Sequence, residues 1–291
     1  MNIQLNNQSA RQELSQEKKE SLTRHALAIR KRIIIMLLEA KSGHTGGPLG
    51  LSDIFSFLFF HALLVNETKD ETKCETRDRF ILSNGHTCPV YYATLIEKGI
   101  IPDAATMTLR KFGSILQGHP HREFLPLLET SSGPLGSGIS QGVGMALGLR
   151  LKNKNEKVIV ITGDGELDEG NNWEGIMLAG KEKLSNLCVI VDRNNIQIDG
   201  NTEDILPLEP LGDKWHAFNW NVIEVSGHDF DALNAAWEKF KACIDKPSVI
   251  IAYTVPGRGV SFMEGDFHWH GKAPNADEAQ KALQELTKNN L

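Results

Sequence analysis

One βαβ unit, at residues 157–198, constrains the possible fold of this chain more than any other feature. A strand-like run, Val158–Ile161, leads into Gly163-Asp164-Gly165, and a stretch of helical composition follows. A second apolar run, Leu187–Val191, is followed within three residues by Asn194. Ligands of open α/β folds bind where the carboxyl ends of parallel strands meet. We therefore predict that Asp164 and Asn194 face each other at that edge of the sheet.

The chemistry of this unit favours a diphosphate held by a metal ion. The glycines on both sides of Asp164 let the backbone approach a bulky anion, and the helix after them offers unpaired N–H groups. One carboxylate, the amide oxygen of Asn194 and a free backbone carbonyl, such as that of Ile196, suit a hard octahedral cation such as Mg²⁺. The alternative is a mere tight turn at residues 163–165. The strand before it, the helix after it and the second strand ending in Asn-Asn argue against this.

The bulk composition is that of an ordinary globular protein. With 291 residues, 41% hydrophobic and 23% charged, the chain suits a single α/β domain over residues 1–291, with residues 1–15 as a flexible tail. A net charge of −6 argues against nucleic-acid binding, which typically requires a basic surface. The longest apolar run, Ile54–Val65, is too short for the ~20 residues of a membrane span.

The N-terminus and the cysteines favour a cytoplasmic location. Residues 1–19 are polar and show no signal-peptide pattern. The cysteines form no C-x-x-C pair and lie in unlike contexts, which favours reduced thiols. They are Cys74, Cys88, Cys188 and Cys243.

Histidines recur in glycine-rich turns along the chain. A long helix over Gln16–Lys41 is followed by His44 in a loop that reaches Gly50, and Ser52-Asp53 is expected to cap a helix to Leu64. Further histidines in such segments are His86, His119, His268 and His270, whereas His121 is interpreted as a surface residue. One such histidine is more often structural, but the repetition indicates a shared site. Zinc is a weaker alternative, because no His-x₃-His or cysteine pairing provides ligand spacing.

Strand and helix patterns alternate over the rest of the chain, which predicts a three-layer α/β/α fold with a mainly parallel sheet. The exposed loop Gly133-Pro134-Leu135 is suited to forming a binding wall. The glycines of the following helix reflect either tight packing or approach to a ligand. Predicted strands are 80–82, 221–225 and 248–253, predicted helices are 87–98, 139–152 and 229–243, and 66–79 is an exposed connection.

Taken together, these segments resemble the amino-terminal, diphosphate-binding half of transketolases, which are thiamine diphosphate enzymes. The resemblance covers nearly the whole chain and implies the thiamine diphosphate-binding fold of the PP type. The residues that carry it are Lys41-Ser42-Gly43-His44, Asp78–His86, Gly118-His119-Pro120, Gly133–Gly136, the pair Gly163-Asp164-Gly165 and Asn194-Asn195, and His270-Gly271. Two positions depart from the family pattern, Thr45 where proline is frequent and Pro256 where an aliphatic residue is common.

The resemblance also implies roles for single residues. Asp164, Asn194 and the Ile196 carbonyl correspond to the Mg²⁺ ligands. His44 and His119 are similar to histidines that bind the donor sugar, and Glu169 is similar to an acidic residue that links cofactor sites across a dimer interface. The implied catalytic residues are His44, His86, His119, His270 and Glu169. The implied contacts of thiamine diphosphate are His86, Gly133, Pro134, Leu135, Gly163, Asp164, Gly165, Glu166, Asn194, Ile196 and His270.

A full transketolase has a second, pyrimidine-binding domain, and nothing in this chain matches it. The resemblance therefore implies one subunit of a split transketolase, completed by a C-terminal subunit in an α2β2 assembly. Its reaction would be the transfer of a two-carbon ketol unit between sugar phosphates, as in the pentose phosphate pathway.

Other functions remain as alternatives. Within thiamine diphosphate enzymes they are a subunit similar to deoxyxylulose phosphate synthase and a transketolase specialised for other sugars. A non-catalytic cofactor-binding subunit would not need several histidines around its site. A nicotinamide-dependent dehydrogenase would show G-x-G-x-x-G after an early strand, and Gly133–Gly138 lacks such a strand.

Overall fold

The computed structural model describes residues 13–65 and 76–288. Most of the predicted tail, residues 1–12, and most of the predicted connection, residues 66–75 with Cys74, lie outside the described residues. The backbone N–H of Leu14 donates to Asp231, and the Ser15 side chain caps the first helix. Cys88, Cys188 and Cys243 are free thiols.

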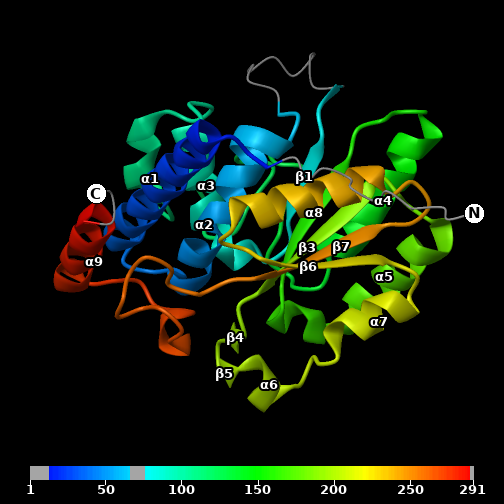
Figure 1. Cartoon of the computed structure of the whole chain (residues 1–291). Helices are drawn as coiled ribbons and strands as arrows, with labels where there is room; N and C mark the ends of the chain where they lie inside the picture. The colour runs from blue at the N-terminus through cyan, green and yellow to red at the C-terminus, as the bar shows by residue number, and fades with distance from the viewer. Residues whose placement is uncertain (1–12, 66–75, 289–291) are drawn as a thin grey trace, which may run out of the picture.

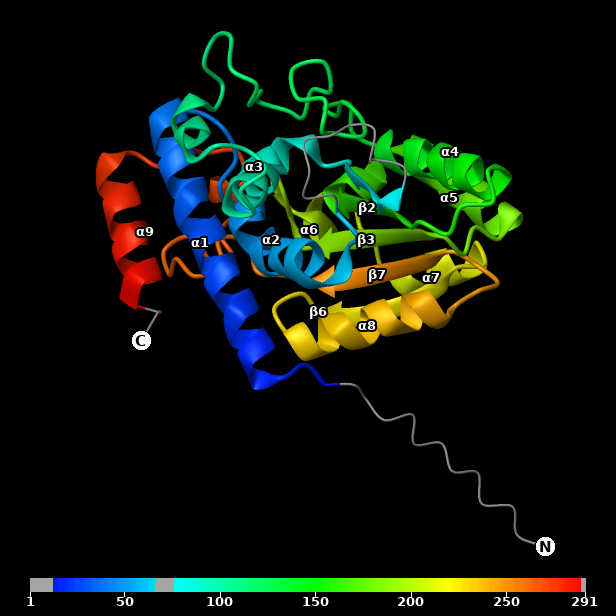
Figure 2. The same ribbon diagram turned by 90° about the horizontal axis from the view of Figure 1, so that it is seen from above.

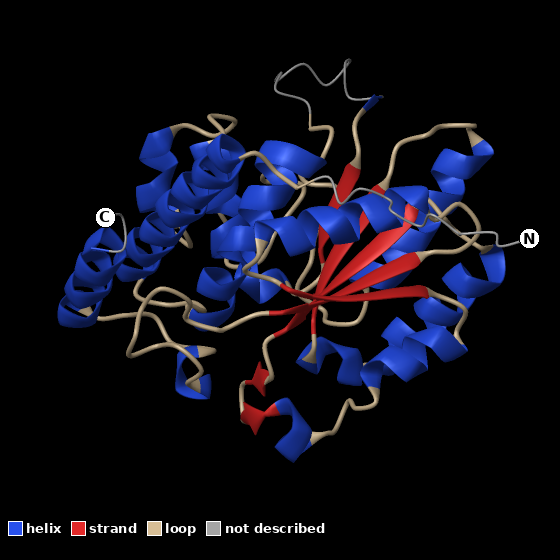
Figure 3. Cartoon of the chain, viewed as in Figure 1, coloured by secondary structure: helices blue, strands red, loops and turns tan. Residues whose placement is uncertain are grey.

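A five-stranded parallel sheet forms the centre of the molecule (Figure 3). Its strand order is β1-β2-β3-β7-β6, so the two strands of the βαβ unit are neighbours inside the sheet. Gly163 pairs with Asp192 in the register, which brings the ends of these two strands together. The strands are β1 (Arg79–Leu82), β2 (Val158–Gly163), β3 (Leu187–Arg193), β6 (Asn221–Ser226) and β7 (Ser248–Tyr253). All strands predicted from the sequence are confirmed.

Helices cover both faces of the sheet, which confirms the three-layer prediction (Figures 1 and 2). One face carries α1 (Gln16–Ala40), α2 (Gly46–Phe57), α3 (Cys88–Glu97) and α8 (Phe230–Ala242), with α9 (Ala276–Lys288) packed on α1. The other face carries α4 (Gly138–Leu151), α5 (Gly170–Glu182) and α7 (Leu211–Ala217). Short elements connect these layers: a π-helix at Leu58–Ala62, 3₁₀ turns at Gly85–Thr87, Asp103–Thr108, Gly165–Asp168 and Phe267–Trp269, the hairpin of β4 (Ile196–Gln197) and β5 (Gly200–Asn201), and α6 (Thr202–Ile205).

The side chains of the central strands alternate between two hydrophobic cores. In β2, Ile159 and Ile161 belong to the core under α1, α2 and α3, whereas Val158 and Val160 belong to the core under α4 and α5. Every residue of β3 is buried. Such strands have continuous apolar runs because both of their faces lie under helices.

The beginning of α2 corrects the sequence-based prediction. Gly46 to Gly50 were expected in a loop and Ser52 at the helix cap, but α2 already begins at Gly46, and the Ser52 hydroxyl donates to the Pro48 carbonyl within the helix. Gly46 and Gly50 lie where other backbone segments come close to the helix. A Cβ atom at Gly50 would lie only 2.9 Å from the carbonyl oxygen of Val255.

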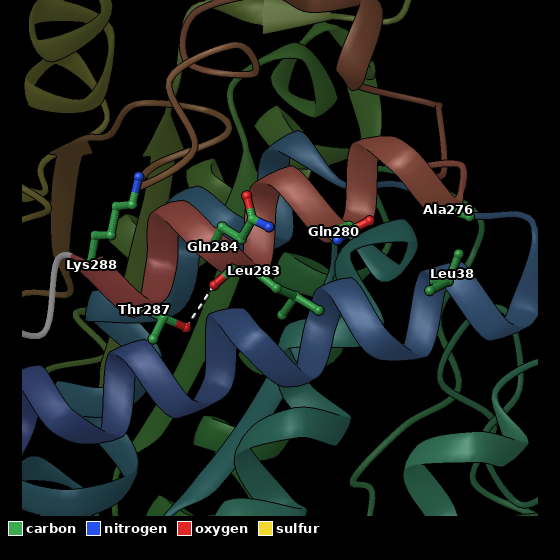
Figure 4. A pocket seen from close by; sticks show the side chains of 7 residues that line it. All are labelled: Leu38, Ala276, Gln280, Leu283, Gln284, Thr287 and Lys288. Atoms are coloured by element: carbon green, nitrogen blue, oxygen red, sulfur yellow. Dashed lines mark hydrogen bonds between the residues drawn. The ribbon is translucent and has the colours of Figure 1, made fainter.

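A groove of about 570 Å³ runs between α1 and α9 (Figure 4). Among the described residues that line it, only Lys288 is titratable, and none lies in the turns that follow the strands. Because it lacks acid–base groups, this groove is a poor candidate for the functional site. No helix within residues 13–65 and 76–288 is long and apolar enough to cross a membrane.

Candidate active site

A second pocket, of about 430 Å³, opens at the carboxyl ends of β1, β2 and β3. The βαβ unit and the histidine turns meet here. Its lining residues are His44, Asn84, His86, His119, Gly133, Leu135, Gly163, Asp164, Gly165, Glu166, Asp168, Glu169, Asn194, Ile196, Gln197, Ile198 and His270. Of the site residues predicted from the sequence, Pro134 and His268 are not among them. Both are exposed, and His268 pairs with Asp266 at 2.6 Å.

Asp164 directly follows β2 and is almost completely buried, with 1% of its surface exposed. One carboxylate oxygen accepts the Gly165 N–H at 2.8 Å. The other accepts the Asn195 N–H at 2.7 Å and the Arg193 guanidinium at 3.1 Å. Burial raises the pKa of Asp164 to about 6, although these donors oppose the shift. A bound cation would favour the ionised carboxylate further.

Asn194 is oriented by the buried carboxylate of Asp192. The Asn194 amide nitrogen donates to Asp192 at 2.8 Å, and its oxygen accepts the Ile196 N–H at 3.0 Å. The Thr254 hydroxyl donates to the second oxygen of Asp192. Burial raises the pKa of Asp192 to about 7. The amide oxygen of Asn194 therefore lies on the side away from Asp192, in the pocket that also contains Asp164 and Ile196.

Three histidines from distant segments form one cluster in this pocket. The ring centroids of His44 and His86 are 4.9 Å apart, those of His86 and His270 5.1 Å, and those of His44 and His270 5.6 Å. The Nδ1 atoms of His44 and His270 are buried and have no hydrogen-bond partner within the described part of the chain. A ligand could satisfy both atoms.

Burial keeps these imidazoles neutral near pH 7. It lowers the pKa of His44 to about 4, and His270 and Arg110 add to this effect. Burial also lowers the pKa of His86, His119 and His270. A neutral imidazole has one N–H donor and one acceptor nitrogen, so each ring could pass a proton in either direction.

The wall of the pocket depends on Glu166, which is 3% exposed. One carboxylate oxygen accepts the Ser83 hydroxyl and the Gly136 N–H, and the other accepts the Thr162 hydroxyl and the Gly163 N–H. Both oxygens are thus used within the protein. Glu166 connects the ends of β1 and β2 with the loop at residues 133–138, which is a positioning role.

The remaining predicted residues lie at the rim of the pocket. Leu135 is 39% exposed, and His119 and Glu169 are exposed. Among the described residues, the Glu169 carboxylate has no hydrogen-bond or ion-pair partner. His121 is half-buried and packs edge-on against Phe124.

Three functional residues were not predicted from the sequence. Asn84 lines the pocket, is 1% exposed and has a buried side-chain oxygen without a partner in the described structure. Asp192 orients Asn194, and Arg193 holds Asp164. The sequence contained a signal that could have identified them, namely polar residues directly after an apolar strand, as in Ser83-Asn84 and Asp192-Arg193. Burying such residues costs free energy unless they form hydrogen bonds or bind a ligand.

The residues present fit a diphosphate and a divalent ion. One buried carboxylate, an amide oxygen and the carbonyl of Ile196 leave room for ligand oxygens around a hard cation. The unsatisfied atoms of His44, His270 and Asn84 provide further hydrogen-bonding capacity. Within residues 13–65 and 76–288, no three His, Cys, Asp or Glu side chains gather as a metal-binding group.

A parallel α/β sheet with a glycine-flanked carboxylate and an Asn at neighbouring strand ends is typical of the open-sheet class of proteins, whose ligands bind at this edge. Comparison with known proteins identifies the family. The family "Transketolase, thiamine diphosphate binding domain" matches residues 22–290. The chain therefore belongs to this family.

Relatives of similar length are named as subunits. The chain is 40% identical over 258 residues to one subunit of an apulose-4-phosphate transketolase from Phocaeicola vulgatus, covering 89% of this chain and 91% of the relative. It is 36% identical over 272 residues to one subunit of a 6-deoxy-6-sulfo-D-fructose transketolase from a Clostridium species, covering 94% and 98%.

A solved structure of transketolase from Campylobacter jejuni superimposes with a TM-score of 0.85 at 29% identity. That comparison covers 94% of this chain but only 43% of the transketolase chain. The present chain is thus similar to one part of a longer enzyme and to whole subunits of others.

Proposed function

We propose that this chain is the N-terminal subunit of a split transketolase. With a C-terminal partner, it would transfer a two-carbon ketol unit reversibly from a ketose phosphate to an aldose phosphate, dependent on thiamine diphosphate and Mg²⁺. The observation that carries the proposal is one pocket that combines the Asp164–Asn194 strand ends with four histidines. The similarity to subunits named as transketolases supports it.

Each part of the pocket has a task in this proposal. Asp164, Asn194 and the Ile196 carbonyl would hold Mg²⁺, and Gly165 with His86 would contact the diphosphate. Gly133 and Leu135 would form the wall beside the cofactor rings. Thiamine diphosphate, when bound, supplies the electron sink that cleavage of a carbon–carbon bond requires.

The histidines supply the acid–base groups. His44 and His119 would donate to the hydroxyl groups of the donor sugar, and His270 would stabilise negative charge on the reacting oxygen. Their neutral state near pH 7 suits both roles, because each ring can donate from one nitrogen and accept at the other. A positioned acid or base of this kind typically contributes about 10²- to 10⁴-fold in rate.

Several features support a partner subunit. The pocket is open at the rim, where Leu135 is 39% exposed and Glu169 has no partner in the described part of this chain. A reaction with a charged intermediate needs a site that excludes water. A C-terminal subunit, in an α2β2 assembly, would close the site and provide its remaining groups.

We further propose a cytoplasmic location and a place in sugar phosphate metabolism such as the pentose phosphate pathway.

The test is to purify the chain with the product of the neighbouring gene and to assay ketol transfer with and without thiamine diphosphate and Mg²⁺. We expect transfer by the complex only when both are present, and none by either chain alone. Transfer by the single chain would contradict its assignment as a subunit. No transfer by a stable complex that binds the cofactor would contradict the reaction.

The names of the relatives favour a second version of this function. Two relatives are named for apulose 4-phosphate and 6-deoxy-6-sulfo-D-fructose. In this version, the donor substrate of the present chain is likewise an unusual sugar. A panel of ketose donors, including these two, distinguishes the versions. A non-catalytic role for this chain predicts instead that His119→Ala leaves the activity of the complex unchanged.

A further inference from the structure

The guanidinium group of Arg110 lies between the two loops that carry His44 and His119. A Cβ atom at Gly118 would lie 3.0 Å from the Arg110 Nε and Cζ atoms, and one at Gly43 would lie 3.7 Å from Nε. These two glycines directly precede His119 and His44. Arg110 also donates to the Gly118 carbonyl at 3.3 Å and to the Ser42 hydroxyl at 3.5 Å.

The backbone conformation of Arg110 is costly. Its φ is 60°, in the left-handed region that residues other than glycine rarely adopt. This conformation costs roughly 1–2 kcal/mol and persists where the surrounding structure requires it. The backbone N–H of Arg110 donates to the Leu116 carbonyl at 2.8 Å, which closes the turn between Arg110 and the His119 loop.

No carboxylate of the described residues forms an ion pair with Arg110. The adjacent Lys111, in contrast, pairs with Glu39. The titratable groups near the guanidinium are the imidazoles of His44 and His119, the thiol of Cys88 and the phenol of Tyr92, whose pKa burial raises. Burial raises the pKa of Cys88 to about 12, so this thiol is neutral and does not compensate the charge.

We propose that Arg110 is a positioning residue, which ties the His44 loop to the His119 loop and places its positive charge beside both imidazoles. Two glycines make room for the flat guanidinium, and its uncompensated charge disfavours a second positive charge on either ring. What these histidines act on rests on the proposed function. Their linkage through Arg110 does not.

The electrostatic pattern supports this role and provides an internal control. Burial is the main cause of the lowered pKa of His119, and Arg110 is the next. For His44, burial is followed by His270, Arg110 and His119. The lowered pKa of His270 has burial as its cause, without Arg110.

The first measurement is an NMR titration of the histidines in the isolated chain, with Arg110→Met, Arg110→Lys and the matched control Lys111→Met. We expect Arg110→Met to raise the pKa of His44 and His119 by about half a unit and to leave His270 unchanged. Arg110→Lys retains the charge and should leave all three near their wild-type values. Unchanged titrations in Arg110→Met, or equal shifts in Lys111→Met, would overturn the proposal.

The second measurement is ketol transfer by the reconstituted complex as a function of pH. Both Arg110 variants should lower kcat/KM about tenfold. Neither methionine nor lysine has the planar set of N–H donors with which arginine bridges the two loops. Only Arg110→Met should move the acidic limb of the profile to higher pH. If Arg110→Met does not fold, full kcat/KM in Arg110→Lys overturns the proposal. If the wild-type complex transfers no ketol unit, the proposed function fails while the titration still decides the role of Arg110.

Discussion

Asp164 is a buried carboxylate that its neighbours hold in place, as the proposed Mg²⁺ site requires. Two backbone N–H groups and the Arg193 guanidinium hold it in place, and Arg193 itself pairs with Glu203 and Glu209 at 2.6 and 3.1 Å. Because Arg193 has these other carboxylate partners, Asp164 can bind a metal ion without leaving the guanidinium unpaired. A side chain fixed by its neighbours in this way binds a ligand with little loss of conformational entropy.

Replacing Asp164 with asparagine should abolish metal-dependent cofactor binding. The variant keeps the shape of the side chain but removes its charge, so we expect the affinity for thiamine diphosphate in Mg²⁺ to fall more than about 100-fold. Calorimetric titration of the complex measures this. The exposed Asp199→Asn is the matched control and should bind like the wild type. Equal affinity in Asp164→Asn would remove Asp164 from the metal site.

Glu166 should matter for stability as well as for the site. Glu166→Ala would leave two buried hydroxyls and two backbone N–H groups without their acceptor, which should cost about 3 kcal/mol or more in the free energy of unfolding. Urea denaturation of the isolated chain measures this cost. Glu169→Ala, at the exposed rim, should change stability by less than about 0.5 kcal/mol. A similar loss of stability in both variants would show that the hydrogen bonds of Glu166 do not stabilise the wall of the pocket.

At the scale of elements, segments far apart in the sequence meet around α2. The carbonyl of Val255 packs against Gly50, and that of Trp269 would lie 3.3 Å from a Cβ atom at Gly46. The Thr45 hydroxyl donates to the Lys272 carbonyl at 2.6 Å. These contacts hold the chain on either side of His270 against the segment that carries His44.

A pair of glycine-to-alanine substitutions tests this packing. Gly50→Ala should destabilise the isolated chain by roughly 1–3 kcal/mol, because the new methyl group meets the Val255 carbonyl. Gly144→Ala in α4 has open space around it and should stabilise the chain by about 0.5–1 kcal/mol through helix propensity. Thermal melting of both variants provides the comparison. A stabilising Gly50→Ala would mean that the close approach to α2 is not a constraint.

The histidine cluster should make the isolated chain sensitive to acid. The unfolded state binds a proton on His44 near the ordinary pKa of 6.5, whereas the folded state does so only at about 4. The unfolded state therefore binds more protons in this window, and the free energy of unfolding falls as the pH decreases from 6.5 to 4. His44 alone would account for about 2–3 kcal/mol. Denaturation at several pH values should show a smaller slope in His44→Gln, and an unchanged slope would contradict this explanation.

At the scale of the whole molecule, the sequence predicts the layers and the strand-end residues well. Apolar runs such as Val158–Ile161 mark strands buried on both faces, and the polar residues after them must lie at the edge of a parallel sheet. The glycine-rich histidine turns lead to the same edge. For this reason His44, His86 and His270 could be assigned to one site although they are distant in sequence.

The strand order, the start of α2 and the hydrogen bonds of Glu166 depend on contacts between residues far apart in the sequence, which local sequence patterns do not reveal. The order of the five strands follows from pairings such as β3 with β7, which are far apart in the chain. The early start of α2 was not predicted because glycine has low helix propensity, and only the packing of Val255 explains Gly50. The partners of Glu166, which use both of its carboxylate oxygens, are visible only in three dimensions.

Anomalous scattering from Mn²⁺ in crystals of the assembled complex with thiamine diphosphate is the most direct test of the central claim. We expect one peak about 2.1 Å from oxygens of Asp164, Asn194 and the Ile196 carbonyl, with the diphosphate completing its ligands. A cofactor bound without an ion at these three residues, or an ion held elsewhere on the chain, would contradict the account.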